Sequence, residues 1–501
     1  MNKMKSMLLL GGLLVLASCS NDFLETEPNH RVDGDRQNEL LLEDPERISA
    51  IIGGAYATFY CGDPYMSSSQ DDWGMSAYKI VAEVMCDDVA FYPLAGQFSQ
   101  DQQLIFREPN YRRPVSMWRQ FYYIISSLNS AIGVLKTAEG TSDEVDSMLG
   151  QALAMRAYMY YWLVNMWQQP YSADPEAPAV PIYLDDVLAN VLNRAPVKDV
   201  YAVIDDDFSK ACTLLKGKRI GNTSINEYAA AGLYANALMF LGRYTEAAQQ
   251  AAYAQNGGRL GGAADLMSGF NSLSMCEVLW GYAVTEEWNI VYGSFMSHMN
   301  PYIDGYAPPG YYTKLAGSAL VDKIDARDLR KAWFGLNQAY NVDDFDFSNI
   351  EKAGLAAYVP NKFQCPGNFM ADVIYLRVAE CCFVEAEAWY LAGNEGNARS
   401  ALEKVMGTRI AGYSAASLSG QALYDEICFQ KRVELWGEGA RLFDAKRRNE
   451  TLDRTKSKNF AAALTSYDAM TYSARDYRMI YKIPSIELEN NEYILPEDQN
   501  P

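Results

Sequence analysis

Along most of the chain the hydrophobic positions recur every three or four residues, which is the period of an α-helix with one buried face. In the stretch 151–167, Leu153, Ala157, Tyr160 and Val164 fall on one side of such a helix. The same period predicts helices over 47–60, 77–85, 117–136, 143–167, 198–215, 225–241 and 245–255. Pro- and Gly-rich stretches at 169–181 and 257–269 are expected to be loops. The chain is therefore expected to be mainly α-helical.

Two stretches of the chain look alike. "LGRYTEAAQQAA" and "LAGNEGNARSAL" place Gly242 and Gly393 after Ala-rich helices predicted over 228–241 and 374–391. A glycine in this place ends a helix with a backbone conformation that other residues adopt less readily. The pattern resembles the turn inside a tetratricopeptide helix pair. Because the copies lie about 150 residues apart, they indicate a helical scaffold that a long insertion interrupts.

The predicted insertion, 257–368, has a different pattern. It begins with the strand-like "CEVLWGYAV" and continues with many Tyr and Trp residues interleaved with Gly, Pro, Asn and Asp. A smaller stretch, 61–114, has the same character. Aromatic loops on a rigid scaffold are a common place for binding function. We therefore expect the ligand site in these two stretches.

The N-terminus reads as a processing segment. Lys3 and Lys5 precede an apolar run over 7–17, which is too short to span a membrane. The run ends in Leu-Ala-Ser-Cys, which resembles the bacterial lipobox, so Cys19 is expected to be lipidated. The alternative is an ordinary signal peptide with an incidental cysteine. The expected organisation is a signal peptide over 1–18, a lipidated cysteine and tether over 19–45, and one domain over 46–501, with its helical scaffold at about 46–256 and 369–501.

Composition narrows the possible ligands. The formal charge of −20 should repel nucleic acid and anionic lipid, but not a neutral ligand such as a sugar. The 35 Tyr residues outnumber the 19 Phe residues, and Tyr suits half-exposed contact surfaces because it has an apolar face and a polar tip. The nine cysteines include no CxxC motif. They are expected to be mostly buried free thiols.

Motifs for catalysis or for a cofactor are not visible. The two histidines, His30 and His298, belong to no HExxH or Ser-His arrangement, and GxSxG and P-loop motifs are absent. "GEGARL" at Gly437 lacks the third glycine of a dinucleotide fingerprint and is interpreted as a helix end. Asp344 and Asp346 only faintly suggest a calcium loop. We predict no metal and no cofactor, although a glycosidase needs just two carboxylates, whose separation the sequence does not show.

Short motifs follow one another over nearly the whole chain. They are the lipobox with "NDFLE" and Pro28, "LNSAIGVL" with Asn129, "RAYMYYWLVNMW" from Arg156, "VPIYLDD" from Val180, "YLRVAECCFVEAEAWYLAGN" with Arg377, Glu380, Glu387 and Ala388, "DEICFQKRVELWGEGARLFDAKR" with Glu434, Leu435, Glu438, Gly439, Arg441 and Asp444, and the ending "YKIPSIELENN" and "DQNP". In this order they resemble the SusD/RagB family of outer-membrane nutrient-binding lipoproteins. The chain departs from the family pattern at Gln430-Lys431 and at Arg448-Asn449.

The charged residues of the longest motif are interpreted as structural. Glu438 and Arg441 are three positions apart, and so are Arg441 and Asp444, so that all three are expected to share one helix face and to pair there. Such pairs would fix the scaffold and take no part in catalysis.

The resemblance implies a mainly α fold, in which a tetratricopeptide-like helix-pair scaffold carries a large, loop-rich insertion with little β structure. It also implies a non-catalytic, lipid-anchored protein of the outer membrane, facing the cell exterior, that captures an oligosaccharide. The implied partner is a TonB-dependent, SusC-like transporter that receives the ligand. The alternatives are binding of a peptide or another nutrient in the same complex, a surface glycosidase, and a structural subunit of a surface assembly.

The ligand-binding residues are expected among the loop aromatics, because sugar rings have apolar C–H faces that stack on Tyr and Trp rings. Family loop sequences diverge, so the resemblance carries over no binding residue. The alternative for each candidate is a place in the core. The candidates are Trp73, Tyr92, Trp288, Tyr292, Tyr306 and Tyr311.

Overall fold

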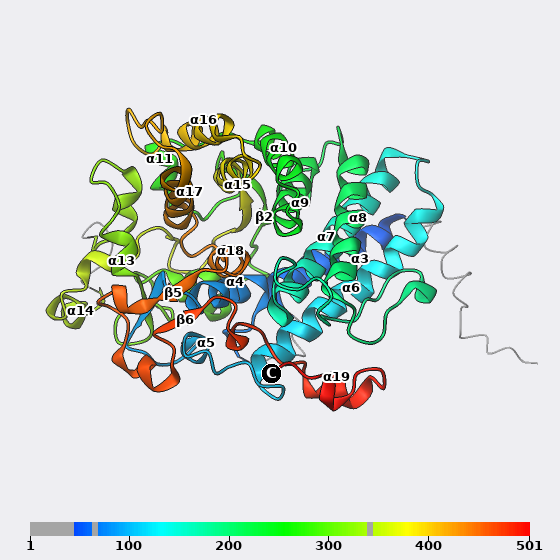
Figure 1. The fold of residues 1–501 in the computed structure, drawn as a ribbon, viewed down its shortest axis with the longest axis horizontal. Coiled ribbons are helices and arrows are strands. Elements are labelled where there is room, and N and C mark those ends of the chain that lie inside the picture. The colour runs from blue at the N-terminus through cyan, green and yellow to red at the C-terminus, as the bar shows by residue number, and fades with distance from the viewer. Residues whose placement is uncertain (1–44, 63–68, 338–343) are drawn as a thin grey trace, which may run out of the picture. The chain divides into compact units, whose positions relative to one another are not determined.

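The computed structural model describes residues 45–62, 69–337 and 344–501. The chain divides into two compact units, Met1–Ile48 and Ser49–Pro501, and the second unit contains nearly all described residues (Figure 1). Cys19, the predicted signal peptide and most of the predicted tether lie outside the described residues, so these predictions stay untested.

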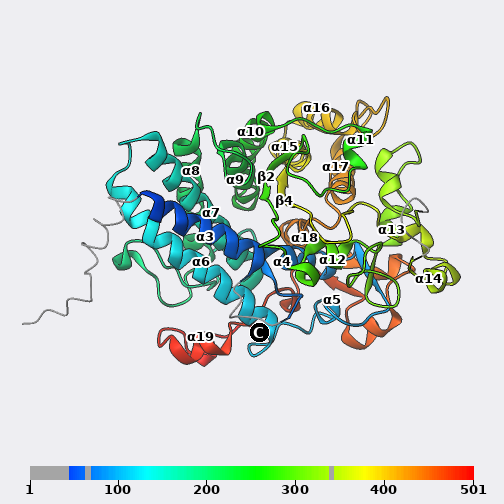
Figure 2. The same cartoon turned by 180° about the vertical axis from the view of Figure 1, so that it is seen from behind.

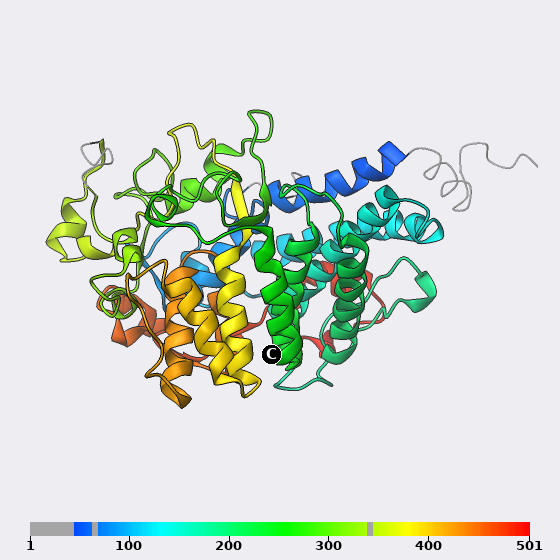
Figure 3. The same ribbon diagram turned by 90° about the horizontal axis from the view of Figure 1, so that it is seen from above.

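Long helices form the scaffold of the second unit. They are α3 (Pro45–Cys61), α4 (Gly74–Val84), α6 (Arg112–Thr137), α7 (Asp143–Trp167), α8 (Val197–Leu215), α9 (Glu227–Leu241), α10 (Tyr244–Ala254), α15 (Val378–Leu391), α16 (Glu395–Met406), α17 (Gly420–Glu434) and α18 (Arg441–Arg448). Helices α6 to α10 each pack on the next one, and α10 then packs on α15. Figure 3 shows α9 and α10 (green) beside α15 (yellow), so that the scaffold continues across the insertion. The expected mainly α fold is confirmed.

The two predicted helix pairs are also confirmed. Helix α9 begins after Asn226, whose side chain accepts hydrogen bonds from the Tyr228 and Ala229 amides, and it ends at Gly242 with φ 71°. In the second pair, α15 and α16 are separated by Gly393 with φ 79°. Both glycines therefore occupy the left-handed region that favours glycine at the end of a helix.

In the part of the chain that the structure describes, the strands are short and come in three antiparallel pairs. Strand β1 (Val89–Tyr92) pairs with β3 (Thr313–Ala316), β2 (Val278–Tyr282) with β4 (Val373–Arg377), and β5 (Thr451–Asp453) with β6 (Thr471–Ser473). The helix predicted over 374–391 is wrong in its first turn, because residues 374–377 belong to β4. Figure 2 shows β4 beside β2, near α15. Pairing with β2 satisfies the backbone of this apolar stretch, and the helix begins only after it.

The insertion contains little regular structure besides β2 and β3. Its helical turns include α11 (Ala263–Leu266), α12 (Phe295–Met299), α13 (Ser318–Val321), α14 (Ser348–Lys352) and the 3₁₀ turns Val291–Gly293, Leu329–Trp333 and Ala356–Tyr358. Outside the insertion, α5 (Ser99–Gln102) lies in the smaller aromatic stretch and α19 (Ser485–Asn490) near the C-terminus.

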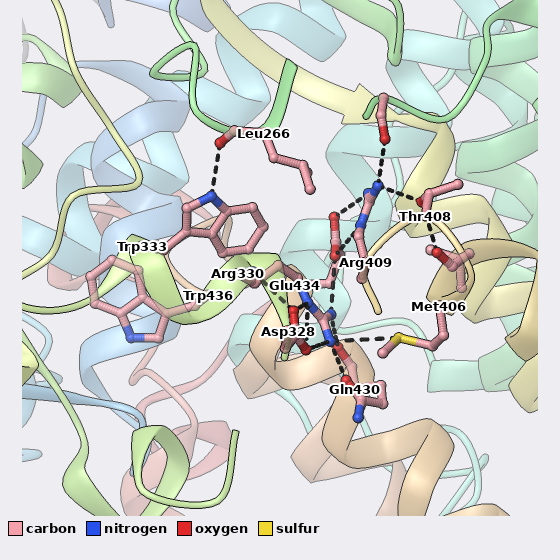
Figure 4. Close-up of polar contacts among 12 residues, drawn as sticks. Leu266, Asp328, Arg330, Trp333, Met406, Thr408, Arg409, Gln430, Glu434 and Trp436 are labelled. Atoms are coloured by element: carbon pink, nitrogen blue, oxygen red, sulfur yellow. Dashed lines mark hydrogen bonds and ion pairs between the residues drawn. The ribbon is translucent and has the colours of Figure 1, made fainter. Parts of the chain in front are cut away.

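A buried cluster of ion pairs fastens the insertion to the scaffold. Glu434 is fully buried. Its Oε1 accepts hydrogen bonds from Arg377 (2.7 Å) and Arg409 (2.8 Å), and its Oε2 accepts one from Arg330 (3.1 Å). Figure 4 shows Glu434 with Arg409 and Arg330. Glu277, just before β2, accepts further bonds from Arg377 (2.8 Å) and Arg409 (2.9 Å). We call these five residues the ion cluster. Because Glu277 and Arg330 belong to the insertion, the cluster joins it to the end of β4 at Arg377, to the turn after α16 at Arg409 and to α17 at Glu434.

The electrostatics of the ion cluster follow from this geometry. Burial alone raises the pKa of the Glu434 carboxyl, but Arg409, Arg377 and Arg330 together lower it well below its ordinary value. Buried charges need such complete pairing, because an unpaired charge in the interior is costly. Glu434 is therefore ionised, and its role is structural.

The pairing expected within one helix is wrong. Glu438 precedes α18 and lies in a turn, where it pairs with Lys362 and with Arg377 (2.8 Å). Arg441 pairs with Asp87 (2.9 Å), and Asp444 pairs with Lys431 (2.8 Å). The turn contains two glycines with positive φ, Gly437 and Gly439, so no continuous helix joins the three charged positions. Each of them instead connects this segment to a distant one.

The cysteines of the described residues are all free. Cys86, Cys381 and Cys382 are buried, whereas the side chains of five others are only partly covered. The expectation of free thiols is confirmed for these residues, but the expectation that most are buried is wrong.

Candidate functional site

Aromatic side chains from separate loops meet on one part of the insertion. The rings of Tyr292 and Tyr306 lie 6.0 Å apart, and Tyr306 is nearly parallel to Tyr312 at 6.3 Å. The Trp73 ring lies over Gly293, so closely that a β-carbon there would be 3.1 Å from it. We call Trp73, Tyr292, Tyr306 and Tyr312 the aromatic surface. It brings together three of the six predicted aromatic residues, from stretches more than 200 positions apart.

A network of polar contacts lies behind the aromatic surface. The Tyr306 hydroxyl donates to the Gln70 side-chain oxygen, and His298 Nε2 donates to the Gln70 carbonyl at 3.0 Å. The His298 ring is buried and nearly parallel to Tyr306 at 5.2 Å. Burial lowers the pKa of His298 to about 3, so the ring is neutral at physiological pH. Gln70 thus connects the loop that carries Trp73 to the loop that carries Tyr306.

Ion pairs hold the Trp73 loop from its other side. Arg113 is fully buried and donates to Asp71 (3.0 Å), to Asp101 (3.0 Å) and to Asp72. Arg112 also pairs with Asp71, at 2.8 Å. Burial alone raises the pKa of the Asp71 carboxyl, but Arg113 and Arg112 lower it far below its ordinary value. The start of α6 therefore fixes the backbone just before Trp73.

Several of the predicted rings are open to solvent. Tyr292 is 41% exposed, Trp288 is 42% exposed and Tyr311 is 50% exposed. Trp288 lies in the same loop as Tyr292, and that loop is fastened by Asn289, whose side-chain amide donates to the Asn368 carbonyl at 2.9 Å. Exposed apolar faces supported from behind are typical of binding surfaces.

Tyr92 is placed differently from the other five. It ends β1 opposite Thr313, and its hydroxyl donates to the Asn349 carbonyl at 3.3 Å. The ring contacts that define the aromatic surface do not include it. Tyr92 stays a predicted binding residue, at a separate place from Tyr306.

A groove that the sequence analysis missed lies beside the aromatic surface. Its volume is about 820 Å³, and it is lined by Asn271, by residues 302–304, by Asp344 and Phe345, and by residues 364–367. We call it the acidic groove, because Asp304 and Asp344 are its charged residues. The sequence gives little signal for it, since it forms between three short segments that are unremarkable by themselves. Gln70, His298 and Tyr312 were missed as well, and only Tyr312 had a local signal, its position next to Tyr311.

Other kinds of site find little support in the described part of the chain. Among these residues, no group of three or more His, Cys, Asp or Glu side chains is arranged to hold a metal ion. No described helix is both long enough and apolar enough to cross a bilayer. The aromatic surface and the acidic groove offer aromatic faces for stacking and carboxylate, amide and hydroxyl groups for hydrogen bonds.

Comparison with known families gives two matches. Residues 22–238 match a family described as starch-binding and associating with the outer membrane, and residues 359–501 match the SusD family. SusD-like protein P2 of Formosa agariphila is 22% identical over 246 residues, which are 49% of this chain and 44% of that protein. In that comparison the chain spans less than half of its relative's length.

Solved structures share the fold over most of the chain. A SusD-like carbohydrate-binding protein from Bacteroides vulgatus has a TM-score of 0.75 and 22% identity, covering 90% of this chain and 97% of that one. A SusD superfamily protein from Bacteroides thetaiotaomicron has a TM-score of 0.74 and 20% identity, covering 91% and 99%. At these identities the likeness establishes the fold.

Proposed function

The chain belongs to the SusD family, and from this premise we propose that it binds oligosaccharides at the cell surface without cleaving them. The observation that carries the proposal is the aromatic surface, whose loops are fixed from behind and whose rings are partly covered, with Tyr292 41% exposed. The family description as starch-binding and the carbohydrate-binding relative from Bacteroides vulgatus support the same ligand class.

The mechanism of binding follows from the chemistry of a sugar ring. Its apolar C–H face stacks on a Tyr or Trp ring, and its hydroxyl edge exchanges hydrogen bonds with polar side chains. Trp73, Tyr292 and Tyr306 would form the central stacking platform, with Trp288 and Tyr311 at its sides. Because Gln70 and Arg113 already hold the platform loops, binding would cost little further ordering of the protein.

Glycan arrays with substituted proteins test this function. Trp288→Ala and Tyr306→Ala are each expected to weaken binding of the bound oligosaccharide by about 1–3 kcal/mol, the range of aromatic anchors in binding sites. Isothermal titration calorimetry with the oligosaccharide identified on the array measures the change. Tyr123→Ala is the matched control, since Tyr123 is a 51% exposed tyrosine of the scaffold helix α6.

Two outcomes would contradict the proposal. Unchanged affinity in both Trp288→Ala and Tyr306→Ala would remove these residues from the site. The appearance of new reducing ends when the protein is incubated with the glycan would indicate a glycosidase.

We further propose that the protein is held in the outer membrane by lipid on Cys19 and passes its ligand to a TonB-dependent, SusC-like transporter. The lipobox sequence and the family description as associating with the outer membrane support this location. Attachment by two or more acyl chains is stable, whereas one chain binds a membrane only marginally. A tethered protein beside its transporter would make capture effectively local.

Cys19→Ala tests the anchor separately from the binding site. Ligand affinity should be unchanged, because the residue lies in the N-terminal segment, while retention in the membrane fraction should be lost. Cell fractionation with immunoblotting measures retention, and a variant that stays in the membrane fraction would contradict the proposed anchor.

A further inference from the structure

Two walls of the acidic groove continue along the chain toward the aromatic surface. Along one wall, residues 302–304 of the groove lead directly to Tyr306. Along the other wall, residues 364–367 lead to Phe369, whose ring lies 5.6 Å from Tyr292. A chain of sugars stacked on the aromatic surface would therefore have a direct way into the groove.

The groove offers hydrogen-bonding groups suited to hydroxyls. Asp304 and Asp344 are exposed carboxylates, and Gln364 contributes an amide nitrogen that is covered and has no hydrogen-bond partner among the described residues. Asn271 also lines the groove, and its side-chain amide donates to the Gln364 backbone carbonyl at 2.7 Å. Carboxylates accept stronger hydrogen bonds from hydroxyls than neutral groups do.

Positive charge is missing from the groove lining. No lysine or arginine is among the described residues that line it. Two buried cations of the insertion are committed elsewhere: Lys362 donates to the Glu434 carbonyl (2.7 Å) and to Glu438 (2.5 Å), and Lys314 donates to the His298 carbonyl (3.1 Å). Lys352 on α14 is exposed and lowers the pKa of Asp346, but it is not among the residues that line the groove. A carboxylate or sulfate on a ligand would find only like charge here.

We infer that the acidic groove extends the glycan site and selects oligosaccharides whose sugars carry no carboxylate or sulfate group. The inference rests on the proposed function and adds the ligand class to it. Recognition of an anionic sugar needs Arg or Lys in the site, whereas like charges placed opposite each other oppose binding. The formal net charge of −20 also opposes the binding of an anionic ligand.

The experiment uses matched probes that differ only in charge. Acidic oligosaccharides, such as oligogalacturonates and hyaluronan fragments, are printed on an array beside their carboxyl-reduced, uncharged forms and beside neutral malto-, xylo- and manno-oligosaccharides. The full chain is expected to bind only uncharged probes. For any oligosaccharide that it binds in the carboxyl-reduced form, the affinity for the acidic form should be lower by at least about tenfold.

The possible results separate this inference from the function on which it rests. Binding of a uronate or sulfated probe at least as tightly as its uncharged partner would overturn the inference while leaving glycan binding intact. Absence of binding to every probe of either class would overturn the proposed function, and the inference with it.

Charge reversal in the groove provides a second measurement. Asp304→Lys and Asp344→Lys should each reduce the preference for the uncharged form severalfold, by improving binding of the acidic probe. The matched control is Asp206→Lys, because Asp206 is an exposed aspartate on α8 and the substitution changes the net charge equally. An equal change in the control would assign the selectivity to the whole-molecule charge and would overturn the role of the groove.

Discussion

The ion cluster and the aromatic surface show two ways of holding planar side chains in place. In the ion cluster, Glu434 is fully buried and each of its carboxylate oxygens accepts hydrogen bonds from two guanidinium nitrogens. In the aromatic surface, Tyr306 is held by a single side-chain bond to Gln70 and by neighbouring rings. The first arrangement is closed to solvent, whereas the second includes the Tyr292 ring, which is 41% exposed.

The difference indicates that one part of the insertion fixes it to the scaffold and another part is available for binding. The segments at Glu277 and Arg330, where the insertion meets the scaffold, are fixed by buried ion pairs. Removing one partner of such a pair leaves the other charge unpaired, which is strongly destabilising. The outer loop of the insertion at Tyr306 is held by a hydrogen bond to Gln70 and by ring contacts with Tyr292 and Tyr312. Rigidity at the base and uncovered apolar area at the tip are the combination that a pre-organised binding surface needs.

The largest expected effect is on the ion cluster. Glu434→Gln removes the charge that compensates Arg330, Arg377 and Arg409, so the free energy of unfolding should fall by about 3–5 kcal/mol. Chemical denaturation followed by circular dichroism measures it. Glu489→Gln, an exposed residue of α19, is the control and should change stability by less than about 0.5 kcal/mol. A small loss in Glu434→Gln would show that the cluster is not what fastens the insertion.

The next effect concerns a charge that lies under the aromatic surface. Lys314 is buried beneath the Phe91 and Phe98 rings, at 5.1 and 5.2 Å, and among the described residues no carboxylate lies within ion-pair distance of it. Burial lowers the pKa of Lys314 to about 7, although the nearby Asp71 opposes the shift. Between pH 7 and the ordinary lysine pKa of 10.5, the unfolded chain therefore binds a proton at this residue that the folded chain has lost.

Stability should consequently rise with pH across this window. The contribution of Lys314 is up to about 1.4 kcal/mol per pH unit. Lys314→Met should remove that part of the slope, as measured by denaturation at pH 7, 8 and 9, whereas Lys216→Met at an exposed position should keep it. An unchanged slope in Lys314→Met would mean that Lys314 stays charged in the folded protein, as a buried ammonium group without an ion-pair partner.

The smallest expected effect is at the bond that orients the aromatic surface. Tyr306→Phe removes the hydrogen bond to Gln70 and keeps the ring, so the free energy of unfolding should fall by about 0.5–1.5 kcal/mol. Tyr311→Phe is the matched control at a half-exposed tyrosine and should be neutral. Equal stability of both variants in thermal denaturation would indicate that ring packing alone orients Tyr306.

The sequence predicted the helical scaffold well, because long amphipathic helices repeat one local pattern many times. Its errors have local causes. Helix α6 begins at Arg112, five residues before the predicted start, since Pro114 lies in the first turn, where a missing amide hydrogen breaks no helical bond. The strand β4 was assigned to a helix because a short apolar run fits either structure until its partner strand is known.

The candidate site could be predicted only in part. The aromatic loops were identifiable from composition, but their meeting was not, since Trp73 packs on Gly293 through contacts that no local pattern encodes. The acidic groove was missed because its walls come from three segments with no common motif. The pairing of Glu438 was mispredicted because Gly437 and Gly439 break the helix that the spacing rule assumed.

The packing of α10 on α15 has a consequence for the evolution of the protein. The two helices are in contact although Ala254, at the end of α10, and Val378, at the start of α15, lie more than 120 positions apart. For the packing of the helices, the whole intervening segment therefore acts as one closed loop. The entropy of closing a flexible loop grows only with the logarithm of its length, and doubling the length costs about 0.6 kcal/mol. Insertions and deletions at the outer part of 257–368 would therefore be nearly neutral for the stack. Related proteins could therefore change their ligand through sequence changes in this segment while the helices stay the same.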